Sequence, residues 1–253
     1  VNSSIETELI IPSDTTIIGK CAASGKKFKK ISFLSNANLS EIGGAAFRSC
    51  DLLESVDVPE SVISIGAYAF GDCSNLKQVK LPKELKYIEP NLFINCKRLM
   101  KVDIGDSVKQ ISFSVFSGCS SLTSINLPDS LTEIMQCAFK GCSSLCEVVI
   151  PSSVEIIDNS VFEGCSSLES IIIPDKISVI DSSTFENCTN LKNIELPVGL
   201  KKIGIAAFAN CESISEFFIP TNVSQIDADA FKNCINLTKI SIPSEIASIS
   251  SST

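Results

Sequence analysis

A phenylalanine recurs with a constant 23-residue period through most of this 253-residue chain, with no insertion over nine copies. A fixed period of this size is typical of repeat proteins, in which similar units stack on one another and bury their apolar sides together. We therefore expect a row of similar coils. The recurring residues are Phe47, Phe70, Phe93, Phe116, Phe139, Phe162, Phe185, Phe208 and Phe231.

Other residues keep the same phase. A cysteine follows each of these phenylalanines after three residues, and a leucine or isoleucine follows after three more. The whole unit reads LxxIxIPxxVxxIxxxAFxxCxx. Its LxxIxI part alternates as a β-strand does, and proline suits the position just after a strand because it cannot donate to a sheet. The VxxI part predicts a second short strand.

These observations predict the fold class. A period of roughly 20 to 29 residues with an LxxLxL core is typical of a leucine-rich repeat. We predict an α/β leucine-rich-repeat solenoid of 23-residue repeats, with a parallel, concave β-sheet. The AFxxCxxL segment is too short for a long helix, so it predicts a turn of 3₁₀- or α-helix on the outer side of each coil.

The pattern predicts one leucine-rich-repeat domain over residues 1–253. Residues 1–38 keep the pattern imperfectly: Ala23 replaces the phenylalanine, Lys26 replaces the cysteine, and the strand ISF at 31–33 is about two residues out of phase. Residues 39–253 are regular and end in mid-repeat. Solenoids normally carry polar terminal caps. We therefore expect a fragment of a longer array, or an open end that associates end to end with another molecule.

Composition excludes several functions. The net charge is −8, and the one basic run, KKFKK at 26–30, is interpreted as a solvated turn, so no nucleic-acid partner is expected. The sequence has no apolar run of about 18 residues, so no membrane insertion is expected in this stretch. It has no histidine, the commonest general base and transition-metal ligand. We expect no enzyme activity, no cofactor and no metal site.

The nine cysteines in phase predict a column of small buried thiols, since free cysteine is among the most buried residue types. The structural residues of two central repeats are then Phe139 with Cys142 and Phe162 with Cys165. A zinc site is not expected because the chain has no CxxC pair. Three cysteines lie outside the column, and their redox state is left open: Cys21, Cys137 and Cys146. Cys137 and Cys146 belong to one coil, so a local disulfide between them is an alternative.

The outward positions of LxxIxI predict where a partner binds. In the N-terminal repeats these positions are polar and of mixed charge, whereas the C-terminal repeats carry apolar residues rimmed by carboxylates. Such a surface is typical of a contact site. The alternative is that single apolar side chains are ordinary on any surface. The predicted partner-binding residues are Val149, Ile172, Phe218, Glu147, Glu195 and Glu216.

Two stretches carry a family resemblance: CSSLTSINLPDSLTEIMQCAF at 119–139 and CSSLESIIIPDKISVIDSSTF at 165–185. They resemble the Treponema-type, or BspA-like, leucine-rich repeat, and the likeness extends from about Leu39 to the C-terminus and, more weakly, over the first 38 residues. The resemblance implies a cell-surface or secreted adhesion protein that binds a partner protein, such as a host extracellular-matrix or cell-surface protein. The alternatives are a cytoplasmic interaction scaffold and the substrate-recognition arm of a larger protein.

Overall fold

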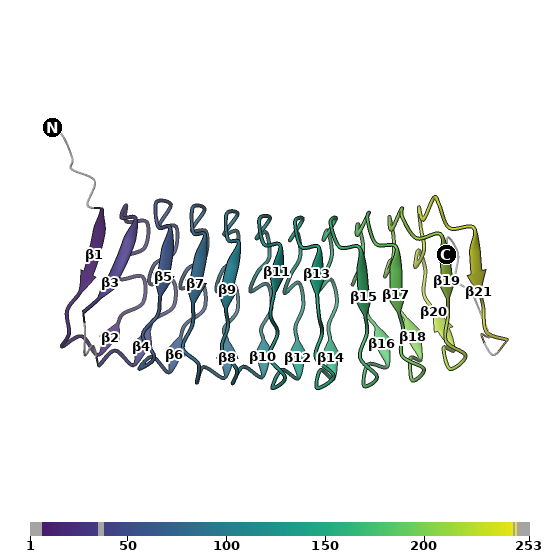
Figure 1. Cartoon of the computed structure of the whole chain (residues 1–253), viewed down its shortest axis with the longest axis horizontal. Coiled ribbons are helices and arrows are strands. Elements are labelled where there is room, and N and C mark those ends of the chain that lie inside the picture. The colour runs from purple at the N-terminus through teal and green to yellow at the C-terminus, as the bar shows by residue number, and fades with distance from the viewer. Residues whose placement is uncertain (1–6, 35–37, 245, 247–253) are drawn as a thin grey trace.

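The computed structural model describes residues 7–34, 38–244 and 246, and these form a rod of stacked coils (Figure 1). Each regular coil contributes two short strands: an odd-numbered strand from the LxxIxI part of the repeat and an even-numbered strand from the VxxI part. The second strand predicted from VxxI is therefore confirmed. The two series run along different sides of the rod, and all paired strands are parallel. The predicted parallel sheet is not continuous: the odd-numbered strands form four sheets, β1-β3-β5-β7-β9, β11-β13, β15-β17 and β19-β21.

The odd-numbered strands define what we call the odd-strand face. They are β1 (Glu8–Ile11), β3 (Lys30–Phe33), β5 (Ser55–Asp57), β7 (Gln78–Lys80), β9 (Lys101–Asp103), β11 (Ser124–Ile125), β13 (Glu147–Val148), β15 (Ser170–Ile172), β17 (Asn193–Glu195), β19 (Glu216–Phe218) and β21 (Lys239–Ser241).

The even-numbered strands are two residues long, and the second residue of each is buried. They are β2 (Ile17–Ile18), β4 (Glu41–Ile42), β6 (Ser64–Ile65), β8 (Tyr87–Ile88), β10 (Gln110–Ile111), β12 (Glu133–Ile134), β14 (Ile156–Ile157), β16 (Val179–Ile180), β18 (Lys202–Ile203) and β20 (Gln225–Ile226).

Strand register follows the sequence period. Val56 in β5 lies opposite Val79 in β7, one full period further along the chain. The first coils differ. Lys30 in β3 lies opposite Ser55 in β5, so the separation along the chain is two residues longer than the 23-residue period. Glu8 in β1 lies opposite Lys30, a separation one residue shorter than the period. The two-residue phase shift predicted for 31–33 is thus confirmed.

The AFxxC segments correct one prediction. Among the described residues they contain turns and no α- or 3₁₀-helix, so the helical turns and the α part of the α/β class are wrong. In the coil around Phe47, Ala45 and Ser49 have φ of 54° and 58°, a left-handed conformation that a right-handed helix cannot include. The Phe47 N–H donates to the Ala69 carbonyl in the next coil at 2.8 Å. Every second N–H group of this segment therefore donates its hydrogen bond to the next coil and not within its own coil.

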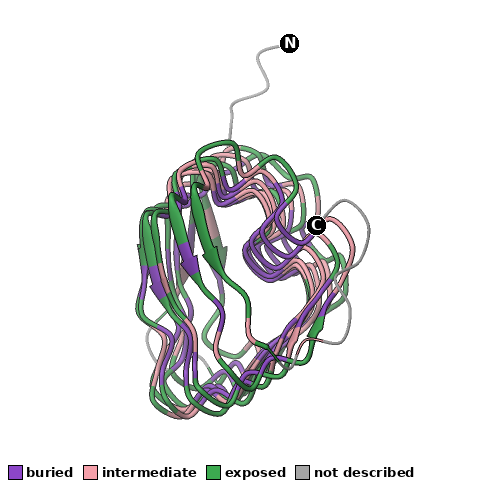
Figure 2. Ribbon diagram, turned by 90° about the vertical axis from the view of Figure 1, so that its right-hand side faces the viewer, coloured by how far each residue is buried: buried purple, intermediate pink, exposed green. Residues whose placement is uncertain are grey.

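The interior is a stack of aromatic rings, which we call the Phe ladder. The nine recurring phenylalanine rings lie parallel, with neighbouring centroids 5.3–5.9 Å apart and interplanar angles of 4–12°. Eight of the nine have less than 2% exposure. Figure 2 shows buried residues lining the inside of the coils and exposed residues on the outside. Each buried ring contributes roughly 2–3 kcal/mol by removal from water.

Two further phenylalanine rings pack edge-on against the two ends of the Phe ladder. Phe28 is 4% exposed, and its ring meets Phe47 edge-on at 6.4 Å, so it covers the first rung of the ladder. The run KKFKK is therefore more than a solvated turn: its lysines are exposed and its phenylalanine is buried. At the other end, the Phe217 ring lies edge-on to Phe208 and Phe231, at 5.0 and 4.7 Å.

Truncation of one ladder ring tests this account of the core. We expect Phe139→Ala to lower the free energy of unfolding by about 3–5 kcal/mol, because it removes two ring contacts and leaves a cavity. Phe113→Ala is the matched control, since Phe113 is 49% exposed, and it should change stability by about 0.5 kcal/mol or less. Urea denaturation followed by circular dichroism measures both. Equal losses in the two variants would contradict the ladder as the main source of stability.

Candidate functional site

One residue in each regular coil lies between the two inward aliphatic side chains of LxxIxI and points outward on the odd-strand face. Neighbouring members lie on adjacent coils, about 4.8 Å apart by the spacing of paired strands. We call this set the central column. It consists of Asp57, Lys80, Asp103, Asn126, Val149, Ile172, Glu195, Phe218 and Ser241, all exposed.

Four of the predicted partner-binding residues lie together on this face. Val149 and Ile172 occupy the central column on consecutive coils and are 72% and 63% exposed. Glu195 lies directly opposite Ile172 in the β15–β17 register. Glu147, two residues before Val149, points to the same side because side chains alternate along a strand. We call Glu147, Val149, Ile172 and Glu195 the aliphatic patch.

The carboxylates of this patch differ from their neighbours. Glu147 and Glu195 make no ion pair with any residue that the structure describes, and both are exposed. By contrast, Glu169 on the intervening coil lies 3.3 Å from the Lys192 Nζ. The patch therefore presents two aliphatic side chains next to two carboxylates that lack a counter-charge among the described residues.

The other two predicted residues, on β19, have a different environment. The Lys239 Nζ lies 3.3 Å from the Glu216 carboxylate and 5.2 Å from the centroid of the Phe218 ring. One lysine thus neutralises the acid and covers part of the ring through a cation–π contact. Phe218 is still 61% exposed, but Glu195 separates it from Ile172 along the column. The structure does not bring the six residues into one cluster.

A cleft of about 630 Å³ opens elsewhere on the odd-strand face and was not foreseen as a feature. It lies between β3 and β5 and is lined by residues 30–34, 57–61 and Lys80. These two strands are paired only through Lys30 and Ser55. The same phase shift that was visible in the sequence at 31–33 therefore separates the strands beyond that pair.

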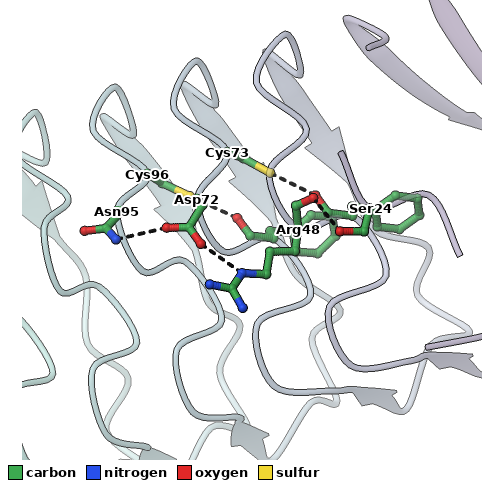
Figure 3. Close-up of polar contacts among 8 residues, drawn as sticks. Ser24, Arg48, Asp72, Cys73, Asn95 and Cys96 are labelled. Atoms are coloured by element: carbon green, nitrogen blue, oxygen red, sulfur yellow. Dashed lines mark hydrogen bonds and ion pairs between the residues drawn. The ribbon is translucent and has the colours of Figure 1, made fainter. Parts of the chain in front are cut away.

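The in-phase cysteines do more than fill space. The Cys142 thiol donates to the Phe116 carbonyl of the preceding coil at 3.2 Å, and the Cys165 thiol donates to Phe139 at 3.3 Å. All nine make an equivalent contact at 3.1–3.3 Å. Figure 3 shows two of them, Cys73 and Cys96. We call this set the thiol ladder; sequence reasoning placed it in the interior but missed the hydrogen bond.

Burial keeps most of these thiols protonated, whereas interaction with the Cys73 thiol lowers the pKa of Cys50 at the N-terminal end of the ladder. Burial raises the pKa of the Cys96 and Cys188 thiols to about 12, and that of the less buried Cys234 to about 11. A neutral S–H group can donate a hydrogen bond, and a protonated thiol is a poor nucleophile. The ladder is therefore suited to a structural role and not to thiol chemistry.

The three cysteines outside the ladder are also free. Cys21 and Cys146 are exposed, and Cys137 is half-buried. The local bridge left open between Cys137 and Cys146 is not formed, and the Cys146 thiol instead donates to the Thr123 carbonyl at 3.4 Å. Cys146 directly precedes the first carboxylate of the aliphatic patch.

Side chains on the outer turns also join successive coils. The Arg48 Nε donates to the Asp72 carboxylate at 2.9 Å, and the Asn95 amide donates to the other oxygen of that carboxylate at 2.9 Å (Figure 3). Further along, the Asn210 amide donates to Asn187 at 2.8 Å. These contacts satisfy polar groups between coils, which is consistent with a structural role for the turn side of the rod.

Within residues 7–34, 38–244 and 246 the structure contains no group of three or more cysteine, aspartate or glutamate side chains placed to hold a metal ion. The same residues contain no helix of the length and apolarity needed to cross a membrane.

The chain belongs to the BspA-type leucine-rich repeat family. A family profile of the BspA-type leucine-rich repeat region matches six overlapping or successive copies over residues 2–123, 40–169 and 109–235. The resemblance inferred from the repeat unit is therefore confirmed. Proteins built from such repeats are suited to protein recognition. No curated protein matches the sequence significantly.

Solved structures show the same architecture. A leucine-rich repeat protein from Bacteroides ovatus is 27% identical, with a TM-score of 0.75, over 95% of this chain and 73% of that one. The leucine-rich repeat protein of T. pallidum is 31% identical, with a TM-score of 0.60, over 63% of this chain and 77% of that one. A leucine-rich cell surface protein from Faecalibacterium prausnitzii is 23% identical, with a TM-score of 0.60, over 99% and 85%. At that identity the last likeness concerns the fold alone.

Two cysteines of one coil test the role of the thiol ladder. Cys142→Ala removes a buried donor and leaves a small cavity, so we expect a loss of about 1–3 kcal/mol in the free energy of unfolding. Cys146→Ala, on the exposed side of the same coil, should change it by about 0.5 kcal/mol or less. Urea unfolding of both variants under reducing conditions makes the comparison. A neutral Cys142→Ala would contradict the structural role of the thiol hydrogen bond.

Thiol labelling tests the burial of the ladder independently. With Ellman's reagent at mildly alkaline pH, we expect Cys21 and Cys146 to react first, Cys137 and Cys234 more slowly, and the remaining ladder thiols only after denaturation. The total in denaturant should be twelve, the number of cysteines in the chain. Mass spectrometry of the intact protein provides the check, because a mass deficit indicating several disulfides contradicts a free thiol ladder.

Proposed function

We propose that this chain is a non-enzymatic recognition or adhesion module that binds a partner protein through its odd-strand face. The observation that supports this most directly is the aliphatic patch, in which Val149 and Ile172 are exposed on consecutive coils of the odd-strand face. Adjacent apolar side chains on a rigid, otherwise polar face supply the desolvated centre that protein interfaces use. We propose that residues 1–253 act as one domain in this role, with the face concave.

We further propose that the parent protein is displayed on the cell surface or secreted. Membership of the BspA-type family supports this. A host extracellular-matrix or cell-surface protein is then the class of partner to test first. Burial protects most of the free cysteines from oxidation in such a compartment.

One observation favours a second candidate, an intracellular interaction scaffold of the same architecture. Cys21 and Cys146 are exposed free thiols, and such thiols persist most readily in a reducing compartment. A scaffold would use the same face, so the two candidates differ in compartment and partner and not in the surface that carries the function. Localisation of the full-length protein in its own cells separates them.

Charge substitution on the odd-strand face tests the proposal. We expect Val149→Asp and Ile172→Asp each to abolish binding to a partner found by screening matrix proteins and glycans, because each places a carboxylate at the centre of the contact. Phe218→Asp should weaken binding less, since Lys239 already covers part of that ring. Surface plasmon resonance measures binding, and circular dichroism reports folding.

Asn126→Asp is the matched control, because it adds the same charge to the same column on the coil next to Val149. It should leave binding within a few-fold of the parent. A partner that binds all four variants equally well would exclude the odd-strand face as the contact surface. Unfolding of Val149→Asp would show that its side chain belongs to the core.

A further inference from the structure

We propose that the aliphatic patch recognises a protein segment in which an apolar side chain is flanked by lysine or arginine. This inference rests on the proposed function, because it assumes that the odd-strand face binds protein, and it specifies the chemistry of the partner. Glu147, Val149, Ile172 and Glu195 are the residues that carry it. Nothing in the fold itself requires their side chains, since all four are exposed.

The first argument is the missing counter-charge. Lysines on this side of the rod are placed to neutralise carboxylates on neighbouring coils: Lys192 lies 3.3 Å from Glu169, and Lys239 lies 3.3 Å from Glu216. Glu147 and Glu195 lack such a lysine among the described residues, although they stand on the same series of strands. A bound cation would take the place that lysine takes in the neighbouring pairs.

The second argument is the relative position of the four side chains. Val149, Ile172 and Glu195 follow one another on the central column, and Glu147 lies beside Val149 along its own strand. Glu195 therefore continues the column beyond Ile172, and Glu147 flanks Val149 across the column. An apolar side chain laid on Val149 and Ile172 would exclude water from the centre, and basic side chains on either side of it would reach the carboxylates.

The third argument is the charge distribution along the rod. Residues 1–100 carry 12 lysines and arginines against 11 aspartates and glutamates, whereas residues 101–253 carry 9 against 18. The net negative charge of the protein therefore lies entirely in the part that contains the patch. Such a field attracts cationic partners and raises their association rate, in a manner that falls with ionic strength.

The basic run KKFKK at 26–30 of a second copy does not supply the proposed ligand. It has the required alternation of charge and apolar character, but Phe28 is 4% exposed because it packs on the first rung of the Phe ladder. Another run, KRLMK at 97–101, exposes Met100 between Arg98 and Lys101. We assign the patch to a different protein; a dimer of the chain in analytical ultracentrifugation that Met100→Ser dissociates would overturn this by assigning the patch to a second copy.

Three labelled peptides of equal length test the inference with the whole chain. Each carries a central Leu-Leu pair, flanked on both sides by two lysines, two glutamates or two serines. We expect the lysine-flanked peptide to bind at least about tenfold more tightly than the serine-flanked one, and this advantage to fall between about 20 and about 200 mM NaCl. The glutamate-flanked peptide should bind most weakly. Fluorescence anisotropy measures all three.

Variants then locate the binding. The pair Glu147→Gln with Glu195→Gln should remove the advantage of lysine flanks, and Val149→Ser with Ile172→Ser should weaken the lysine- and serine-flanked peptides alike. Glu41→Gln with Glu89→Gln is the matched control, because it removes the same charge at two exposed carboxylates outside the odd-strand face. This control should leave affinity within about twofold.

The outcomes separate this inference from the proposed function. Equal binding of all three peptides that is lost in Val149→Ser with Ile172→Ser would overturn the preference for basic flanks and still support the face as a binding surface. Binding that neither pair of patch substitutions changes would overturn the inference by placing the peptide elsewhere. Absence of binding by every peptide would also overturn it, and the Val149→Asp series with protein partners would decide the proposed function separately.

Discussion

Hydrogen bonds between coils are the interaction on which the rest of this structure depends. No described segment satisfies its backbone groups by itself in a helix. Phe47 donates to Ala69 in the next coil on the turn side, and β5 pairs with β7 on the odd-strand face. Because unpaired buried backbone groups are costly, each coil is held in register with its neighbour on several sides at once. The constant period of the sequence follows from this requirement.

The side chains of the interior reinforce the same register. The Phe ladder brings rings within 5.9 Å only if successive coils have equal length. The thiol ladder adds a donor aimed at the carbonyl of the preceding coil, as Cys142 does at Phe116. A slip of one residue would turn inward side chains outward, separate the rings and remove that donor. Backbone and side chains thus specify one alignment, which explains why the unit tolerates no insertion from Phe47 onward.

The sequence predicts the repetition well and local conformation less well. The period is sufficient to place both strand series, and the displaced ISF at 31–33 predicts the irregular register of β3. Helical turns are mispredicted because the spacing of alanine, phenylalanine and cysteine also fits a chain of turns with left-handed residues. A signal was present: Gly141 and Asn210, directly before ladder cysteines, are residue types that tolerate positive φ. Phe28 was misjudged because four lysines surround it.

The sequence pattern predicts which side chains lie on the odd-strand face but not which of them form ion pairs. Alternation places Glu147, Glu195 and Glu216 on one face, but only the coordinates distinguish the acid that Lys239 neutralises from the two without a counter-charge among the described residues. That difference arises because inter-coil pairing depends on which residue type stands one period away. Since the Phe ladder and the thiol ladder specify the register without the central-column side chains, we expect substitutions in that column to cost little folding stability. The outward columns are therefore free to vary in sequence, which the proposed recognition role requires of them.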